Sequence, residues 1–163
     1  ILGCIMITKP SFLETSSALE QPADSAKLQA YAELYCISNF TFLRGASFPE
    51  ELIEQASILG YKALAITDEC SLSGVVRAHT AAKEKGITLI IGSEFNLKEG
   101  CHFVLLASNR RGYGHLSHLI SSARRDTDKG AYYMDYAMVE KHLPADCLAL
   151  WLPDLTQPSE KLA

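Results

Sequence analysis

The sequence predicts an α/β fold in which short strands alternate with helices around a parallel sheet or barrel. Apolar runs of strand length, such as residues 63–67 and 87–91, alternate with segments of helical apolar period. Gly60 and Gly86 follow the intervening helical segments, where a left-handed residue ends a helix. Acidic residues follow both strands within three positions, which is where β/α folds place their sites.

Composition indicates a globular domain. The 163 residues suffice for one domain with a buried core, and 48% hydrophobic with 21% charged residues excludes a disordered tail. The formal net charge of −4 argues against a nucleic-acid-binding surface in this segment, because phosphate binding requires clustered Lys and Arg. The five cysteines form no CxxC pair, which predicts neither a disulfide framework nor a zinc ribbon and favours the cytoplasm. The apolar opening at residues 1–7 is too short to span a membrane, so no membrane partner is expected.

The first residues are predicted to stand apart from the fold. Residues 1–28 are expected to be a flexible leader, because residues 10–26 contain Ser, Thr, Glu, Gln and Pro and show no apolar period. The ordered portion is expected at residues 29–163, starting with a strand at residues 31–37.

Two helices follow with recognisable ends. Ser47 and Glu50 have the spacing of a capping box at the start of the first helix, and Gly60 is its expected stop. The second helix is predicted over residues 72–85 and ends at Gly86. The sequence further predicts helices at residues 112–125 and 135–143 and a strand at residues 147–152.

A small hairpin is predicted between the strand at residues 87–91 and the helix at residues 112–125. Residues 94–97 and 101–104 flank a turn centred on Glu99, which places Asn96 opposite His102 across the ladder. Glu94 lies two residues before Asn96 and therefore on the same face. We expect His102 to return toward the edge that holds Glu94.

Three acidic residues are expected to share one edge of the sheet. Asp68 and Glu69 directly follow one strand, and Glu94 follows the next. Because loops at the carboxyl ends of parallel strands meet at one side, these side chains should form a common rim. A dipole-favoured pair at a helix start remains the alternative for Asp68 and Glu69.

Several motifs together resemble a known family. Residues 31–47 read YAELYCISNFTFLRGAS, residues 60–79 read GYKALAITDECSLSGVVRAH, and residues 91–95 read IGSEF. They resemble the N-terminal PHP (polymerase and histidinol phosphatase) domain of bacterial error-prone C-family DNA polymerases, which are related to the DNA polymerase III α subunit. The resemblance covers roughly residues 29–153, and further agreement comes from RGYGHLSHLI at residues 111–120.

The resemblance implies a distorted β/α barrel, of which this chain would hold the first four or five strands out of seven. It implies a longer parent that adds deoxynucleotides to DNA during damage-induced repair synthesis. Mg²⁺ is expected in the polymerase domain of that parent and no cofactor in this segment. Expected partners are the remainder of the polymerase chain, DNA through the parent, the sliding clamp and other mutagenesis proteins.

The resemblance also implies a degenerate metal site. Metal-binding PHP domains carry two His and an Asp in the first motif and a His in the second, and these positions here hold Tyr35, Ile37, Arg44 and Glu69. An isoleucine has no lone pair, a neutral tyrosine is a poor ligand, and Arg44 is a permanent cation. Only Glu94 and His102 keep ligand chemistry, so they are the residual metal candidates and no catalytic residue is expected.

We hypothesise that the guanidinium of Arg44 takes over the electrostatic role of the metals by pairing with one or more of Asp68, Glu69 and Glu94. Two alternatives remain open. One is a divalent-metal-dependent phosphoesterase or 3′–5′ exonuclease of the PHP superfamily, against which the altered first motif argues. The other is a non-functional gene fragment.

Overall fold

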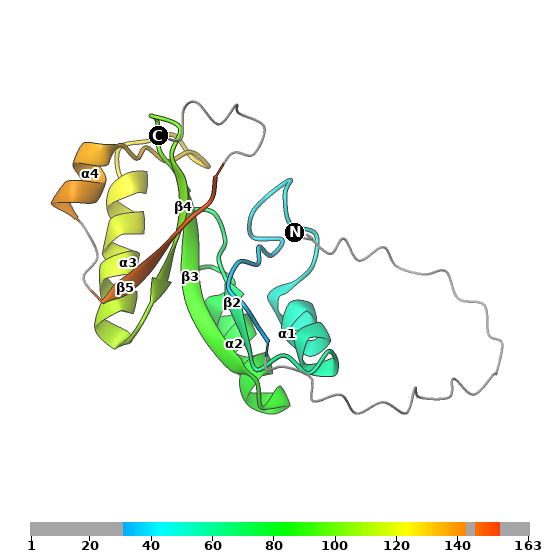
Figure 1. Cartoon of the computed structure of the whole chain (residues 1–163). Helices are drawn as coiled ribbons and strands as arrows, with labels where there is room; N and C mark the ends of the chain where they lie inside the picture. The colour runs from blue at the N-terminus through cyan, green and yellow to red at the C-terminus, as the bar shows by residue number, and fades with distance from the viewer. Residues whose placement is uncertain (1–30, 143–145, 154–163) are drawn as a thin grey trace, which may run out of the picture.

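The structure is a computed structural model that describes residues 31–142 and 146–153 (Figure 1). The leader predicted over residues 1–28 lies outside the described residues. The same holds for Leu143, the last residue of the helix predicted at residues 135–143.

Five strands form one sheet in chain order, and the predicted α/β class is confirmed. The two pairs β1–β2 and β2–β3 are parallel, whereas β3–β4 and β4–β5 are antiparallel. The sheet is therefore mixed, because a hairpin reverses the chain after β3. It curls into part of a barrel (Figure 1). The strands are β1 Ala32–Glu33, β2 Ala63–Ile66, β3 Thr88–Asn96, β4 His102–Ala107 and β5 Cys147–Trp151.

Within residues 31–142 and 146–153, four helices connect the strands: α1 Pro49–Ile58, α2 Val75–Lys85, α3 Arg110–Arg124 and α4 Tyr136–Lys141. Helices α1 and α2 are the crossovers between the parallel strands, and Gly60 (φ 74°) and Gly86 (φ 70°) follow them in the left-handed conformation, as predicted. None of the helices in the described ranges is long and apolar enough to cross a membrane.

The start of α1 corrects the predicted capping box by one residue. The helix begins after Phe48, whose backbone N–H donates to Glu51 Oε2 at 2.9 Å. Pro49 explains the shift, because its fixed φ and missing N–H suit the first helical position and make the preceding residue the cap. Glu50 instead pairs with Arg77 of α2.

Strand β1 is much shorter than the predicted 31–37. Its ladder with β2 ends at Glu33, and beyond that end the Cys36 N–H donates to Thr67 Oγ1 at 3.0 Å. The Thr67 N–H still donates to Cys36 O at 2.8 Å, so the two chains remain in contact. A side-chain hydroxyl thus replaces one main-chain acceptor beyond the end of the regular strand.

The β3–β4 hairpin has the predicted register. Asn96 is the partner of His102, and Glu94 is the partner of Val104. Leu97 N–H donates to Cys101 O at 2.8 Å, and Gly100 takes a φ of 86° in the turn. Strand β3 runs on through Glu94 to Asn96, so Glu94 lies within a strand and not in a loop.

The two faces of the sheet carry different apolar clusters. On the helix face, one cluster packs β2 against α1 and α2, and another packs Phe95 and Leu105 against α3. The opposite face carries Ala65, Val104 and Leu106. Because strand side chains alternate, Glu94 shares this face with its neighbour Val104 and stands at the end of the curled sheet.

Candidate functional site

The ends of β2 and β3 bring two carboxylates side by side. Beyond the regular strand pairing, Glu69 and Glu94 form an isolated parallel bridge. Cys70 N–H donates to Glu94 O at 2.9 Å, and Glu94 N–H donates to Asp68 O at 3.3 Å. We call Asp68, Glu69 and Glu94 the acidic rim. Main-chain hydrogen bonds alone hold the backbone of the acidic rim in place.

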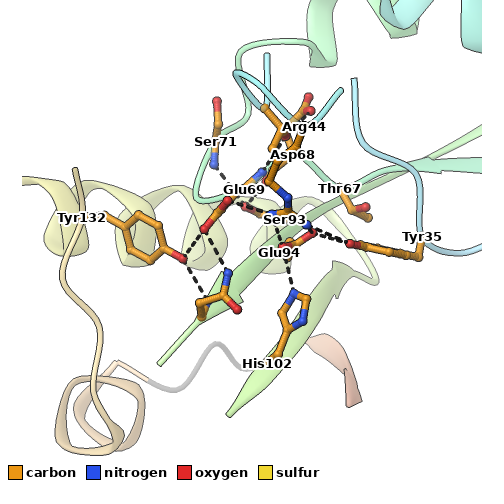
Figure 2. Close-up of polar contacts among 12 residues, drawn as sticks. Tyr35, Arg44, Thr67, Asp68, Glu69, Ser71, Ser93, Glu94, His102 and Tyr132 are labelled. Atoms are coloured by element: carbon orange, nitrogen blue, oxygen red, sulfur yellow. Dashed lines mark hydrogen bonds and ion pairs between the residues drawn. The ribbon is translucent and has the colours of Figure 1, made fainter. Parts of the chain in front are cut away.

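The carboxylate of Glu94 is fully buried and accepts hydrogen bonds from one hydroxyl and one guanidinium (Figure 2). Arg44 Nη1 donates to Oε1 at 2.5 Å, and Arg44 Nη2 to Oε2 at 3.3 Å. Tyr35 OH donates to Oε2 at 2.6 Å. A permanent cation and a phenol thus stabilise the negative charge of this buried carboxylate.

His102 approaches the same carboxylate from β4. Its Nε2 lies 2.8 Å from Glu94 Oε1, and its side chain is 30% exposed. The ring nitrogen is close but not aligned as a hydrogen-bond donor, so the attraction depends on whether the imidazole is protonated. The predicted return of His102 to Glu94 is therefore seen as an electrostatic contact.

Glu69 is the second carboxylate that Arg44 holds. Arg44 Nη1 donates to Glu69 Oε2 at 2.8 Å, while Asn96 Nδ2 and Tyr132 OH donate to Oε1 at 3.0 and 2.9 Å. Partial burial acts to raise the pKa of Glu69, but the hydrogen bonds from Asn96, Tyr132 and Arg44 outweigh it and lower that pKa. Glu69 is accordingly held as an anion.

Arg44 joins both carboxylates through one guanidinium. Its hydrogen bond to Glu94 is the main reason that the pKa of Arg44 is raised, against an opposing effect of burial. The side chain remains 39% exposed, so water screens part of the attraction. Because a guanidinium has five donors in a planar fork, it can serve two carboxylates at once.

Tyr35 occupies one of the two positions where the resemblance implies a histidine ligand. Burial, followed by its hydrogen bond to Glu94, raises the pKa of Tyr35. The phenol therefore stays protonated and acts as a donor to the carboxylate. Ile37, at the other histidine position, is partly buried and offers no donor or acceptor in its side chain.

Asp68 does not pair with Arg44, although the sequence hypothesis allowed it. This carboxylate is 1% exposed and accepts from Ser38 N–H, Ser38 OH and Thr41 OH, each at 2.7 Å. Its function is to anchor the loop that follows β1. The same loop carries Arg44, so Asp68 helps to position the guanidinium by holding the loop backbone.

Sequence reasoning missed two residues that complete the site. The hydroxyl of Tyr132 lies between Glu69 and the Asn96 N–H, from which it accepts at 2.9 Å. The Nε of Arg124, in the last turn of α3, donates to Cys70 O at 2.8 Å and fixes the backbone that follows Glu69. No local sequence signal marks either contact.

The residues present do not fit a cluster of divalent metals. Among residues 31–142 and 146–153, no three His, Cys, Asp or Glu side chains come together as a metal site. The lone pairs of Glu94 already face Arg44 and Tyr35, and a permanent cation stands between Glu69 and Glu94. Burial also raises the pKa of the Cys70 thiol to about 11, which disfavours the reactive thiolate form.

Comparison with known proteins identifies the family of the chain. The family profile described as "PHP domain" matches residues 33–155. The chain is 56% identical over 124 residues to the error-prone DNA polymerase of Methylococcus capsulatus, covering 76% of this chain and 12% of the relative. It is 55% identical over 130 residues to the error-prone DNA polymerase of Dechloromonas aromatica, covering 77% and 13%. The chain therefore spans only about 12–13% of the length of these relatives.

Solved structures show the same fold. A protein from Bifidobacterium adolescentis assigned as a metal-dependent phosphoesterase matches with a TM-score of 0.50 and 26% identity, covering 60% of this chain and 34% of that chain. A two-domain protein from Bacteroides vulgatus containing a predicted PHP-like metal-dependent phosphoesterase matches with a TM-score of 0.53 at 18% identity, covering 80% and 39%. The second likeness concerns the fold alone.

Proposed function

Because the chain belongs to the PHP domain family, we propose that it is the N-terminal PHP segment of an error-prone DNA polymerase and that its role there is structural. Identity above 50% to error-prone polymerases over three quarters of the chain supports this parent. The parent would add deoxynucleotides to DNA during damage-induced repair synthesis, with Mg²⁺ held in its polymerase domain. DNA, the sliding clamp and other mutagenesis proteins are partners of the parent.

The observation that carries the structural role is the pairing of Arg44 with both Glu69 and Glu94. Arg44 belongs to the loop between β1 and α1, Glu69 follows β2, and Glu94 lies in β3. One guanidinium thus ties together three segments that are distant in sequence. A bound cation would do the same, and here the chain supplies its own.

Substitution of Arg44 tests what the rim does. The full-length polymerase with Arg44→Ala should have a lower melting temperature, whereas its initial rate of primer extension at low temperature should stay within about twofold, because a structural role implies that the rim does not touch the reacting atoms. Lys85→Ala is the matched control, since it breaks an exposed ion pair with Glu54. A large loss of rate in a variant that is still folded would contradict a structural role.

A metal-dependent phosphoesterase is the second candidate, favoured by the fold of the protein from Bifidobacterium adolescentis and by the closeness of His102 to Glu94. The donor set argues against it, because two ligands are too few for a functional site. Calorimetric titration of the purified chain with Zn²⁺ and with Mn²⁺ should give less than one equivalent of tight binding. A generic phosphodiester such as bis-p-nitrophenyl phosphate should not be hydrolysed. Stoichiometric metal together with turnover would favour the phosphoesterase.

A further inference from the structure

The loop between β1 and α1 presents two large apolar side chains to solvent. Phe42 and Leu43 are 83% and 89% exposed, the highest values among the large hydrophobic residues that the structure describes. They are adjacent in sequence and immediately precede Arg44. We call Phe42 and Leu43 the apolar tip. Single exposed apolar residues are common on protein surfaces, but a protruding pair at the end of a fixed loop needs a reason.

The loop that carries the tip is held by hydrogen bonds on both sides. Before the tip, the hydroxyl of Thr41 donates to the buried Asp68 at 2.7 Å. After it, the backbone N–H groups of Arg44 and Gly45 donate to Thr41 O at 3.1 and 2.9 Å. The loop backbone is therefore held on both sides of the tip.

The backbone at the tip is itself unfavourable. Leu43 has a φ of 64°, in the left-handed region that a side chain with a Cβ rarely adopts. That conformation costs about 1–2 kcal/mol for an ordinary residue. A glycine or asparagine would fit this position better than an exposed leucine. A strained backbone that points an apolar side chain into water is typical of a position kept for a contact.

We propose that Phe42 and Leu43 dock into an apolar hollow on a region of the full-length polymerase that lies outside this segment. The proposal rests on the proposed function, because it requires the longer parent. The contact would be intramolecular and would attach the PHP segment to the polymerase at the loop that carries Arg44.

The size of the tip favours an occupant in the same chain. A large apolar side chain buries on the order of 150–250 Å². Two of them offer far less than the roughly 800 Å² per partner of a stable independent interface. A tethered surface needs no such area, because a covalent link supplies an effective concentration in the millimolar range. The segment spans only 12% of the Methylococcus capsulatus relative, so most of a polymerase of that length is available as the docking surface.

Other occupants fit less well. Nucleic acid would need free cations beside the tip, but Arg44 is already paired with Glu69 and Glu94. A second copy of the chain would bind too weakly, because the tip buries far less area than a stable independent interface requires. Docking in the same chain has a further consequence, since it would shield the 39% exposed side chain of Arg44 from water and so strengthen its ion pairs.

Site-specific labelling tests the proposal. Phe42→Cys is made in the 163-residue chain and in the full-length polymerase that carries it, and maleimide modification at position 42 is followed by mass spectrometry. If the tip is docked in nine molecules out of ten or more, labelling in the full-length polymerase should be slower by at least about tenfold. Ile58→Cys is the matched control, because Ile58 is 72% exposed on α1 and should label at the same rate in both proteins.

Hydroxyl-radical footprinting of unsubstituted Phe42 gives the same answer without a mutation. Equal modification of the tip in both proteins would overturn the proposal. So would protection that appears in the isolated chain as its concentration rises, which indicates a second copy, or protection that appears only after DNA is added. Primer extension by the full-length chain is measured separately. A protected tip without primer extension supports docking while counting against the proposed polymerase parent.

Discussion

Arg44 and Glu94 face each other through both ends of their planar groups, with Nη1 2.5 Å from Oε1 and Nη2 3.3 Å from Oε2 (Figure 2). The pair is unequal in its environment. The Glu94 side chain is fully buried, whereas that of Arg44 is 39% exposed. A buried carboxylate therefore depends on a cation that water can still reach, and this asymmetry decides what substitutions should do.

Arg44→Ala should destabilise the chain by about 2–3 kcal/mol. Loss of one partner from a fully buried pair typically costs about 3–5 kcal/mol, and the exposure of Arg44 reduces that figure. Arg44→Lys should recover only part of the loss, because an ammonium lacks the planar fork that serves Glu69 and Glu94 together. Urea denaturation at neutral pH measures each difference. The exposed-pair control Lys85→Ala should cost less than about 1 kcal/mol, and an equal loss in both variants would contradict the role of Arg44.

Two tyrosines should titrate late in the folded protein. Burial comes first among the causes that raise the pKa of Tyr35 and of Tyr132, and their hydrogen bonds to Glu94 and Glu69 add to it. A raised folded pKa gives stability that is present below the unfolded value of about 10 and is lost as pH rises through the folded value. Absorbance at 295 nm should therefore show tyrosines that ionise only as the chain unfolds. Tyr35→Phe should remove one of them and cost about 1.5–3 kcal/mol.

Acid should weaken the rim through Glu69. Its folded pKa is lowered, because hydrogen bonds outweigh the opposing effect of burial. The stability this gives is present above the unfolded pKa of about 4.3 and is lost as pH falls through the folded value. Glu69→Gln should therefore be less stable at neutral pH and show a shallower loss below about pH 5. Glu54→Gln, at a 55% exposed position, should keep the wild-type slope, and a wild-type slope for Glu69→Gln would argue against the assignment.

The elements that sequence reasoning located correctly are those set by local rules. Gly60 and Gly86 end helices because a left-handed residue needs no neighbour distant in sequence to favour it. The pairing of Asn96 with His102 follows from a short turn and the two-residue period of a strand. Such features depend on a few consecutive residues, so one sequence was enough to predict them.

The contacts of the rim depend on tertiary structure and were only partly accessible. The residue types at the rim limited Arg44 to three carboxylates, but only the fold shows that Asp68 is taken up by the loop. Tyr132 reaches Glu69 across 63 positions of sequence, which no local pattern encodes. The contact of the Cys36 N–H with the hydroxyl of Thr67, beyond the end of β1, is likewise made across 31 positions.

Asp68 should be tested as the anchor of the loop that carries Arg44. Asp68→Ala leaves Ser38 N–H and the hydroxyl of Thr41 without their buried acceptor, at a cost of about 2–4 kcal/mol. Asp68→Asn should be milder. The Ser38 hydroxyl can rotate to accept from the new amide, while the remaining oxygen still serves the other two donors. Hydrogen exchange of the Arg44 and Gly45 amides should rise in the same order, and unchanged exchange in Asp68→Ala would contradict anchoring.

Gly45 should be the position in this loop that least tolerates a side chain. A Cβ at Gly45 would lie 1.9 Å from the carbonyl oxygen of Ser38, which is closer than any real contact, and backbone cannot yield as a flexible side chain can. Gly45→Ala should therefore open the loop and cost about 1–3 kcal/mol, with faster exchange of the Arg44 amide. Gly114→Ala is the control on α3, because a Cβ there meets no heavy atom within 4 Å and alanine favours a helix by up to about 1 kcal/mol. Thermal melts followed by circular dichroism should move in opposite directions for the two variants. If Gly45→Ala instead melted with the wild type and kept its slow exchange, the tight closure that positions Arg44 at the rim would be refuted.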